Sequence, residues 1–474
     1  MPPRDKSLQS VVILVADGAR PDTLAAAIDR GELPALARLR AEGGMHEVSS
    51  VFPSVTGPAY TPFLMGRFPG PVGLPGIRWY DRARTRTRWP AYARSYVGLD
   101  MREIGRDIDP SVPTLFELAS SRVAALSMIE RGLARHEKVA RGPAFVLRAA
   151  FTHFRGSVNG WLDIDRHVGA RVAERIARER PQVAFCALTG IDKTSHSQGH
   201  DSAVVRNAMR IVDQTAARIR ADAEHDGRWD QMHLWIVSDH GHSPVRTHED
   251  LAGLLRSWGV GVRAHPWTFG LGQRAAVMVS GNAMAHISLD IDRLIRPWWP
   301  ALAAQWEWLA ERLLERESTD LLILPIDAET TEIRARGRGT ARIVMHGGRF
   351  SYRPATGDPL GLGELPDLDA NDAHAATISS DYPDALVQIA HLTASARCGD
   401  LLISAARQWD LRSKWEPIPH VSSHGALHRE HMLVPLLLNR PAAVTPRRTV
   451  DIFASAAAAI GATAPGDGQS WLPE

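Results

Sequence analysis

Three apolar runs along the chain have the continuity of strands that are buried on both faces. Each run carries an acidic residue at or near its carboxyl end: residues 10–16 before Asp17, 182–190 before Asp192, and 232–239 ending at Asp239. Apolar residues at helical spacing predict a helix from Ser202 to about Ala223, between the second run and the third. The same spacing predicts another helix from Thr23 to about Glu42. This order predicts a mostly parallel α/β sheet with helices on both faces, with the acids at the edge where such sheets bind ligands.

The hydrophobic pattern changes at about residue 260. Short runs then alternate between apolar and polar positions, with a helical stretch from Ala301 to Arg316. The parallel pattern resumes with a strand at 400–405 and a last helix at 448–461. We therefore expect an α/β domain of residues 1–259 and 376–474, interrupted by an inserted α+β cap region of residues 260–375.

Composition excludes several classes of protein. The 474 residues are 44% hydrophobic and 23% charged, which is typical of a globular chain, and the net charge of +2 offers no field for a nucleic-acid polymer. Cys186 and Cys398 lie far apart and are expected to be free thiols. The first residues lack the cleavage site of a signal peptide, and no apolar run reaches the roughly 18 residues of a membrane span, so we expect a soluble, cytoplasmic protein.

Two segments combine carboxylates and imidazoles. Asp192 and His196 are four residues apart, a spacing that brings both side chains to one face of a helical turn and suits Zn²⁺. Asp239 and His240 are adjacent at a strand end, where the chain can turn both toward one ion. The alternatives are a surface loop rich in histidine and, for Asp17, an ordinary Asp-Gly turn.

The remaining histidines leave alternatives open. In the late segment that contains His420, His424, His428 and His431, one ligand would be enough. The spacing from 424 to 428 fits two ligands on one helix, whereas Gly425 indicates a turn directly after His424. His200 is expected to be structural, and His242 has no assigned role.

A hydroxyl candidate lies in the stretch FPSVTGP. Gly57 and Pro58 are typical of a helix start, so Thr56 is expected at a helix N-terminus, where unpaired N–H groups attract a phosphate. The simpler interpretation is that Thr56 only caps that helix.

The order and content of these segments resemble the alkaline phosphatase superfamily and, within it, the nucleotide pyrophosphatase/phosphodiesterase family. The resemblance runs from residue 10 to about 460 and consists of five motifs: Asp17 after a strand, Thr56 in FPSVTGP, Asp192 with His196, Asp239 with His240 in SDHG, and His424 in SSHG.

This resemblance implies that residues 1–259 and 376–474 form an alkaline-phosphatase-like catalytic domain. It also implies a metal-dependent phosphoester hydrolase with Thr56 as the nucleophile and two divalent metal ions. One ion would be held by Asp192, His196 and His424, and the other by Asp17, Asp239, His240 and the Thr56 oxygen. Zn²⁺ is the expected metal, with Mn²⁺ as the alternative because three of the six side chains are carboxylates. The implied reaction is attack by Thr56 to form a phosphothreonine ester, which water then hydrolyses.

One residue departs from the family pattern. The family typically has Asn three positions after the nucleophile, to hold a phosphate oxygen, and this chain has Ala59. Tyr60, Arg78 and Lys193 are the side chains that we consider as substitutes in binding the substrate.

Other functions remain open. The same metal cage serves phosphomonoesterases and phosphomutases, and a non-catalytic metal-binding module is the alternative from another class. A sulfatase is disfavoured because Thr56-Gly-Pro-Ala-Tyr lacks the sulfatase motif. The substrate is expected to be a small phosphoester of unknown identity. The basic stretch from Arg131 to Arg148 either faces a phosphorylated head group or is a solvated helix face.

Overall fold

This computed structural model describes residues 9–83, 93–95, 98–265, 272–412 and 420–473. Residues 1–8, which begin the segment considered above as a signal peptide, lie outside these ranges, as do residues 266–271 of the expected cap. No helix among the described residues is long and apolar enough to cross a membrane.

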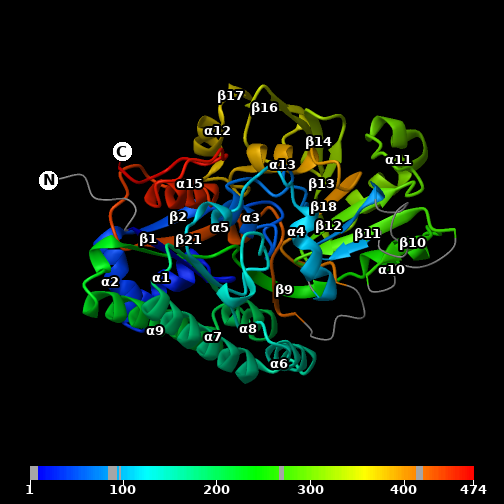
Figure 1. The fold of residues 1–474 in the computed structure, drawn as a ribbon. Coiled ribbons are helices and arrows are strands. Elements are labelled where there is room, and N and C mark those ends of the chain that lie inside the picture. The colour runs from blue at the N-terminus through cyan, green and yellow to red at the C-terminus, as the bar shows by residue number, and fades with distance from the viewer. Residues whose placement is uncertain (1–8, 84–92, 96–97, 266–271, 413–419, 474) are drawn as a thin grey trace.

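A seven-stranded sheet forms one half of the molecule (Figure 1). Its central strand β1 pairs in parallel with β7 on one side and β8 on the other, and β21 pairs antiparallel with β8. The predicted mostly parallel sheet is therefore confirmed. In spatial order its strands are β2 (Met45–Ser49), β21 (Leu433–Leu438), β8 (Met232–Val237), β1 (Ser10–Ala16), β7 (Val183–Leu188), β5 (Arg122–Ala125) and β6 (Lys138–Val139).

Helices cover both faces of this sheet because alternate residues of β1 enter two different cores. Val12 and Leu14 pack in one core, and Val11 and Ile13 pack in the other. The first core is covered by α1 (Pro21–Asp29), α2 (Pro34–Gly43), α7 (Val158–Glu179) and α9 (Ala203–His225), and the second by α3 (Tyr60–Met65), α5 (Leu115–Leu118) and α15 (Val450–Ala459) (Figure 1).

The single helix expected from Thr23 to about Glu42 was wrong, because α1 and α2 are separate helices. Gly31 has a φ of +73°, which an α-helix does not contain, and Pro34 stands in the first turn of α2, where its missing N–H costs nothing. Helical spacing showed which positions are apolar but not where the chain turns.

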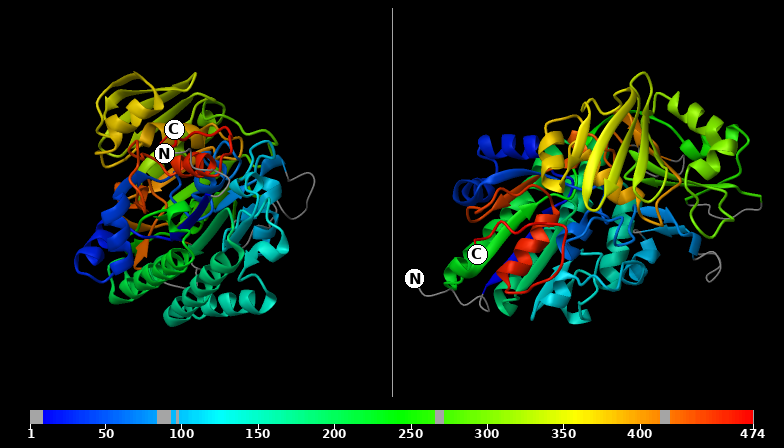
Figure 2. Two further views of the ribbon diagram at one scale, coloured as in Figure 1. Left: turned by 60° about the vertical axis from the view of Figure 1, so that its left-hand side comes forward. Right: turned by 90° about the horizontal axis from the view of Figure 1, so that it is seen from above.

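A second, nine-stranded sheet forms the other half (Figure 2). Its strands in spatial order are β10 (Val262–Ala264), β11 (Ala275–Ser280), β12 (Met284–Leu289), β18 (Leu401–Ala405), β13 (Thr319–Pro325), β14 (Thr330–Ala335), β15 (Gly339–His346), β16 (Arg349–Gly357) and β17 (Leu365–Leu368). The helices packed on it are α10 (Leu251–Ser257), α11 (Pro300–Leu314), α12 (Ala370–Thr377) and α13 (Ala385–Thr393).

The strand expected to return to the parallel sheet at 400–405 lies in this second sheet instead. It is β18, which pairs antiparallel with both β12 and β13. Its side chains enter two cores, Leu402 one and Leu401 with Ile403 the other, so the run is apolar throughout. Burial on both faces produces the same sequence pattern in either kind of sheet. The role of residues 260–375 as a cap stays a prediction.

The elements that remain are short or lie at the edges. They are β3 (Arg78–Tyr80), β4 (Ala93–Ser95), β9 (Ser243–His248), β19 (Gln408–Asp410), β20 (Ser422–Ser423), α4 (Ile104–Asp107), α6 (Pro143–Phe154), α8 (Gly190–Gln198) and α14 (Arg429–Met432), with 3-10 turns at Gly98–Glu103, Arg135–Glu137 and Trp229–Gln231. Figures 1 and 2 place α7 and α9 on the opposite side of the molecule from β14 to β16.

Candidate active site

Three carboxylates gather at the carboxyl edge of the first sheet. Strands β8, β1 and β7 are neighbours in that sheet, and they are followed by Asp239, Asp17 and Asp192 respectively. All three side chains are buried. The backbone N–H of Asp192 donates to the carbonyl of Asp17, over 2.9 Å, and so fixes the loops after β1 and β7 to each other. The acids therefore lie together, as their places at parallel strand ends predicted.

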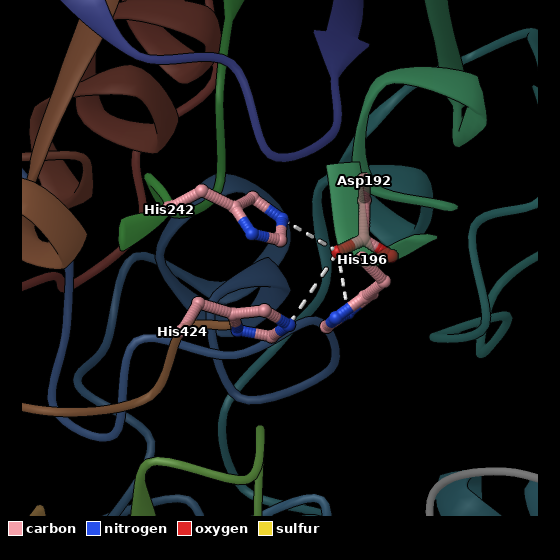
Figure 3. A group of neighbouring side chains, drawn as sticks. All are labelled: Asp192, His196, His242 and His424. Atoms are coloured by element: carbon pink, nitrogen blue, oxygen red, sulfur yellow. Dashed lines mark hydrogen bonds and ion pairs between the residues drawn. The ribbon is translucent and has the colours of Figure 1, made fainter. Parts of the chain in front are cut away.

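Asp192 is the centre of the first group of side chains. Helix α8 turns Asp192 and His196 to one face, as their spacing predicted. The Asp192 Oδ1 atom lies 3.1 Å from His196 Nε2, 2.9 Å from His242 Nε2 and 3.4 Å from His424 Nε2. Figure 3 shows the three imidazoles pointing at this oxygen from three different segments of the chain.

A second group of side chains lies against the first and includes Thr56. His240 Nε2 is 3.5 Å from Asp17 Oδ1 and 3.6 Å from Asp239 Oδ2. The Thr56 Oγ1 atom lies 3.1 Å from His240 Nε2 and 3.4 Å from Asp17 Oδ1. The rings of His240 and His424 stack with their centres 3.6 Å apart, which joins the two groups into one site.

The hydrogen bonds on the far side of three rings fix their tautomers. His196 Nδ1 is 3.0 Å from the carbonyl of Ser422, His424 Nδ1 is 2.9 Å from that of Ser54, and His240 Nδ1 is 3.1 Å from that of Gly241. A carbonyl only accepts, so each ring carries a proton on Nδ1. The Nε2 lone pairs of the neutral rings then converge on carboxylate and hydroxyl oxygens. This is the arrangement by which histidines bind metal ions.

Burial and neighbouring charges shift the pKa values of two of these carboxyl groups in opposite directions. Burial, reinforced by Asp239 and Asp192, raises the pKa of Asp17 well above its usual range. Burial acts against the charged form of Asp192 too, but Lys193 and His196 outweigh it and hold the pKa of Asp192 well below its usual range. Asp239 Oδ2 is buried without a hydrogen-bond partner among the described residues. A buried carboxylate atom of this kind calls for a cation.

The rings of His242 and His424 are neutral at physiological pH. Burial lowers the pKa of His242 to about 3, although the hydrogen bond to Asp192 opposes the shift. Burial and the neighbouring His240 lower the pKa of His424 well below its usual value. Neutral imidazole is the form that coordinates a metal.

The spacing of the donor atoms fits divalent metal ions. Four side chains each offer one donor atom within 4.8 Å of the others: Asp192, His196, His242 and His424. The same holds for a second set of donor atoms, from Asp17, Asp192 and His240. The ligands of a tetrahedral zinc ion with bonds of about 2.0–2.1 Å are separated by roughly 3.3 Å. The separations around Asp192 Oδ1 match that value. The donor types and the convergent lone pairs both fit the implied metals.

Thr56 does not cap a helix. Helix α3 begins at Tyr60, later than expected from Gly57 and Pro58, and no side chain accepts a hydrogen bond from its first turn. Thr56 lies in the preceding turn and is half-buried among fully buried neighbours, so its hydroxyl opens toward the site.

The three candidate substrate-binding residues lie in different places. Lys193 Nζ is 2.7 Å from Asp192 Oδ2. Burial disfavours the charged amine of Lys193, but Asp192 and Asp17 outweigh burial and raise its pKa. Arg78 instead lines a small hollow with Asp250 and Leu411, and this lining includes none of the candidate metal ligands.

Neither Tyr60 nor Ala59 faces the site. The Tyr60 ring packs edge-on to Phe185 in the core beneath the first sheet. Ala59 is fully buried in the core shared with Phe52 and Phe68. Of the three substitutes considered for the family Asn, the structure brings only Lys193 to the candidate ligands.

The alternatives in the late histidine segment are resolved in favour of a turn. Gly425 has a φ of +112°, so His424 and His428 do not share a helix. His428 Nε2 contacts the carbonyl of Ala405, and His431 Nε2 contacts Ser243 Oγ. His420 stacks on His196 with ring centres 4.1 Å apart. Of these four histidines, His424 is the one whose Nε2 lies near Asp192 Oδ1.

Sequence reasoning did not assign His242, which the structure places in the first group. The signal was present in SDHGH, where a histidine comes two positions after His240. Its position could not be predicted, because it depends on the chain turning between β8 and β9 and on Ser422, whose Oγ is 3.2 Å from His242 Nδ1.

Comparison with known proteins identifies the family of this chain. The model of the type I phosphodiesterase/nucleotide pyrophosphatase family matches residues 11–296. The chain belongs to this family. As a member of this metal-dependent family it is a phosphoester hydrolase. No curated protein matches the chain.

Solved structures share the fold at low sequence identity. Human ectonucleotide pyrophosphatase/phosphodiesterase 5 superposes with a TM-score of 0.60 at 13% identity, over 97% of both chains. An inactive form of the murine protein, solved with AMP, gives 0.56 at 14% identity over 97% of both chains. Phosphonoacetate hydrolase from Sinorhizobium meliloti 1021, solved with phosphonoformate, gives 0.57 at 16% identity over 96% of both chains. The alkaline-phosphatase-like fold is thus confirmed.

Proposed function

We propose that this chain is a two-metal phosphodiesterase that acts through a phosphothreonine intermediate at Thr56. The observation that carries the proposal is the position of Thr56 Oγ1 within the second group, 3.1 Å from His240 Nε2 and 3.4 Å from Asp17 Oδ1. The substrate is a small phosphoester, and the cytoplasmic location stays a prediction from the sequence.

Two sets of residues would hold the metals. Asp192, His196 and His424 form one set, with His242 beside them, and Asp17, Asp239, His240 and the Thr56 oxygen form the other. We propose Zn²⁺ in both, because the first set is dominated by imidazole; Mn²⁺ is the alternative. The bound ions would lower the pKa of the Thr56 hydroxyl and neutralise the charge on the phosphate oxygens.

The reaction has two displacements at phosphorus. Thr56 Oγ1 attacks in line, its P–O bond forms as the bond to the leaving alcohol breaks, and the leaving oxygen takes the electron pair and then a proton from water. The Thr56 proton leaves along the hydrogen bond to Asp17 Oδ1. Water then attacks the phosphothreonine from the vacated side and releases the phosphate monoester, while Asp17 returns its proton to Thr56. The proton that the attacking water loses neutralises the hydroxide left when the leaving alcohol was protonated.

Lys193 supports this reaction as the cation nearest the carboxylates. Its amine is 2.7 Å from Asp192 Oδ2, and its side chain remains one-third exposed. We propose that Lys193 contacts a non-bridging phosphate oxygen and so takes over part of the task of the Asn that Ala59 replaces.

The test compares Thr56→Ser and Thr56→Ala in hydrolysis of an aryl phosphodiester and of the matching monoester. We expect faster turnover of the diester by the wild type, partial activity in Thr56→Ser, and a loss of about a thousandfold or more in Thr56→Ala with metal content unchanged. Acid quenching of the wild type during turnover, followed by peptide mass spectrometry, should find phosphate on Thr56.

Three outcomes would count against the proposal. Near-normal turnover in metal-loaded Thr56→Ala would exclude the covalent step. Full activity after a chelator has removed the metals would exclude the metal mechanism. A preference for the monoester would point to the monoesterase or mutase alternative.

A further inference from the structure

Helix α6 exposes apolar side chains that a soluble helix normally buries. Four of the eight large apolar side chains exposed in the described part of the chain lie on it: Val146 (44% exposed), Leu147 (70%), Phe151 (60%) and Phe154 (73%). The one buried residue of α6 is Thr152. At 100° per residue, Leu147, Phe151 and Phe154 share a sector of about 60° on the side away from Thr152. The helix therefore presents one narrow apolar face to solvent.

A basic hollow of about 700 Å³ borders this apolar face. It lies between the start of α6 and the middle of α7, and its lining contains no Asp or Glu. Arg148 stands about 60° around α6 from Phe151, so the hollow begins where the apolar face ends. The basic residues that line it are Arg135, Lys138, Arg141, Arg148, His167, Arg171 and Arg175.

Some of these charges are paired and others are available. Lys138 and Arg141 share Glu130, and Arg171 pairs with Glu174 over 3.2 Å. Arg135 and Arg148 are exposed, and neither side chain has an ion pair within the described ranges. Neither residue contributes to the fold through an internal partner, so their charge is free to meet an external anion.

We propose that α6 and the basic hollow together form a docking surface for the face of an anionic phospholipid bilayer. Leu147, Phe151 and Phe154 would enter the boundary between headgroups and acyl chains, while Arg135 and Arg148 would contact lipid phosphates. An apolar stripe with arginines along its border is the chemistry of helices that lie in a membrane surface. The twelve residues of α6 lie on a bilayer rather than span it, since a span needs about 20.

Charge argues against a second copy of the chain as the occupant. A symmetric contact through α6 would bring two basic hollows together, and like charges across an interface oppose association. A single exposed face of twelve residues is also smaller than the roughly 800 Å² per partner of a stable interface. The surface is separate from the candidate active site, because none of the candidate metal ligands lines the hollow.

Co-sedimentation with vesicles tests this surface. The full chain is mixed with vesicles of phosphatidylcholine alone or of phosphatidylcholine with phosphatidylglycerol, at low and high salt. We expect binding to the anionic vesicles at low salt and at least tenfold less binding to the neutral ones. Replacing Arg135 and Arg148 with Ala should weaken binding about twentyfold and flatten its salt dependence. The triple variant Leu147→Ser, Phe151→Ser and Phe154→Ser should weaken binding at least tenfold.

Matched controls separate this surface from general charge and hydrophobicity. Arg342→Ala with Arg353→Ala removes two exposed arginines from paired positions on β15 and β16, and Val444→Ser removes an apolar side chain that is 41% exposed elsewhere. Both controls should bind like the wild type. Thermal unfolding of each variant should match the wild type, which excludes misfolding as the cause of lost binding.

Several results would overturn the proposal. The protein could bind neither kind of vesicle or both equally. The surface variants could bind as well as the controls do. Soluble glycerol phosphate alone could displace the protein from the vesicles. Light scattering that shows a dimer of the wild type and a monomer of the triple variant would assign the apolar face to self-association instead.

Discussion

The two sheets contribute to the candidate active site in different ways. In the seven-stranded sheet the neighbouring strands β8, β1 and β7 are each followed by one of the three buried carboxylates. In the nine-stranded sheet no strand delivers a candidate ligand, yet the turn between β11 and β12 holds the segment of His424. The N–H of Ala283 donates to the carbonyl of His424 over 3.0 Å, and Ser423 Oγ donates to the carbonyl of Gly281.

The three carboxylates are therefore positioned by their own sheet, whereas His424 is positioned by contacts with the other sheet. A strand end fixes Asp17, Asp192 and Asp239 through the ladder of hydrogen bonds behind it. His424 lies in a loop and depends on contacts with a part of the chain more than 100 residues away. Changes in the first sheet should therefore remove metal binding directly, and changes in the second should weaken it through the position of His424.

The largest effect is expected from Asp192→Asn. The Asp192 carboxylate contacts three imidazoles and Lys193, so its neutralisation removes a ligand-type group from the site and leaves Lys193 without its partner. We expect kcat/KM to fall by about a thousandfold or more and elemental analysis to find at least one metal ion fewer. Asp201→Asn, at an exposed position nearby, is the control. Two retained metal ions in Asp192→Asn would show that this carboxylate is not a ligand.

Substitutions of His242 test whether this residue binds a metal ion or only positions Asp192. If His242 binds the metal, His242→Asn and His242→Gln should both lower metal affinity about 10- to 100-fold in a chelator titration. Gln reaches Asp192 with an N–H donor as His242 Nε2 does, so recovery in Gln but not in Asn would mean that His242 only positions Asp192. We expect no recovery, because a protonated amide nitrogen does not coordinate a metal.

Gly281→Ala tests the second sheet without touching a candidate ligand. Gly281 has a φ of +60°, and a Cβ atom there would collide with Val55 and lie 2.9 Å from the carbonyl of His424. We expect His424 to shift, and activity and metal affinity to fall about tenfold. Gly347→Ala is the matched control, since Gly347 has a φ of +58° with open space around it in the same sheet. Equal losses in both variants would trace the effect to backbone strain alone.

Asp165 supports the first sheet's loops, and its titration should change stability rather than metal binding. Asp165 on α7 accepts the N–H groups of Thr189 and Gly190 at the start of α8, and burial raises its pKa to about 7. The folded state therefore holds a proton that the unfolded chain loses near pH 4. Its contribution to stability is present below that pH and is lost as the pH rises toward 7.

The free energy of unfolding, measured by urea at several pH values, checks this. Between pH 4 and 7 the wild type should lose up to about 4 kcal/mol relative to Asp165→Asn, at about 1.4 kcal/mol for each pKa unit. Asp163→Asn, at an exposed position on the same helix, should show no such trend. A difference between wild type and Asp165→Asn that stays constant with pH would show that Asp165 titrates normally.

The sequence by itself determined the parallel sheet, the acids at its strand ends and the one-turn spacing of Asp192 and His196. These follow from local rules: burial makes a strand continuously apolar, and helical geometry places residues four apart on one face. The five ordered motifs added Thr56 and His424 through resemblance.

Only the tertiary structure decided which loop residues meet. It placed β18 in the second sheet, divided one expected helix at Gly31 and Pro34, moved Tyr60 and Arg78 away from the candidate ligands, and brought His242 to Asp192. The physical reason is the same in each case. These positions depend on contacts between segments that are distant in the chain, and hydrophobic periodicity records that a residue is buried but not which residue it is buried against.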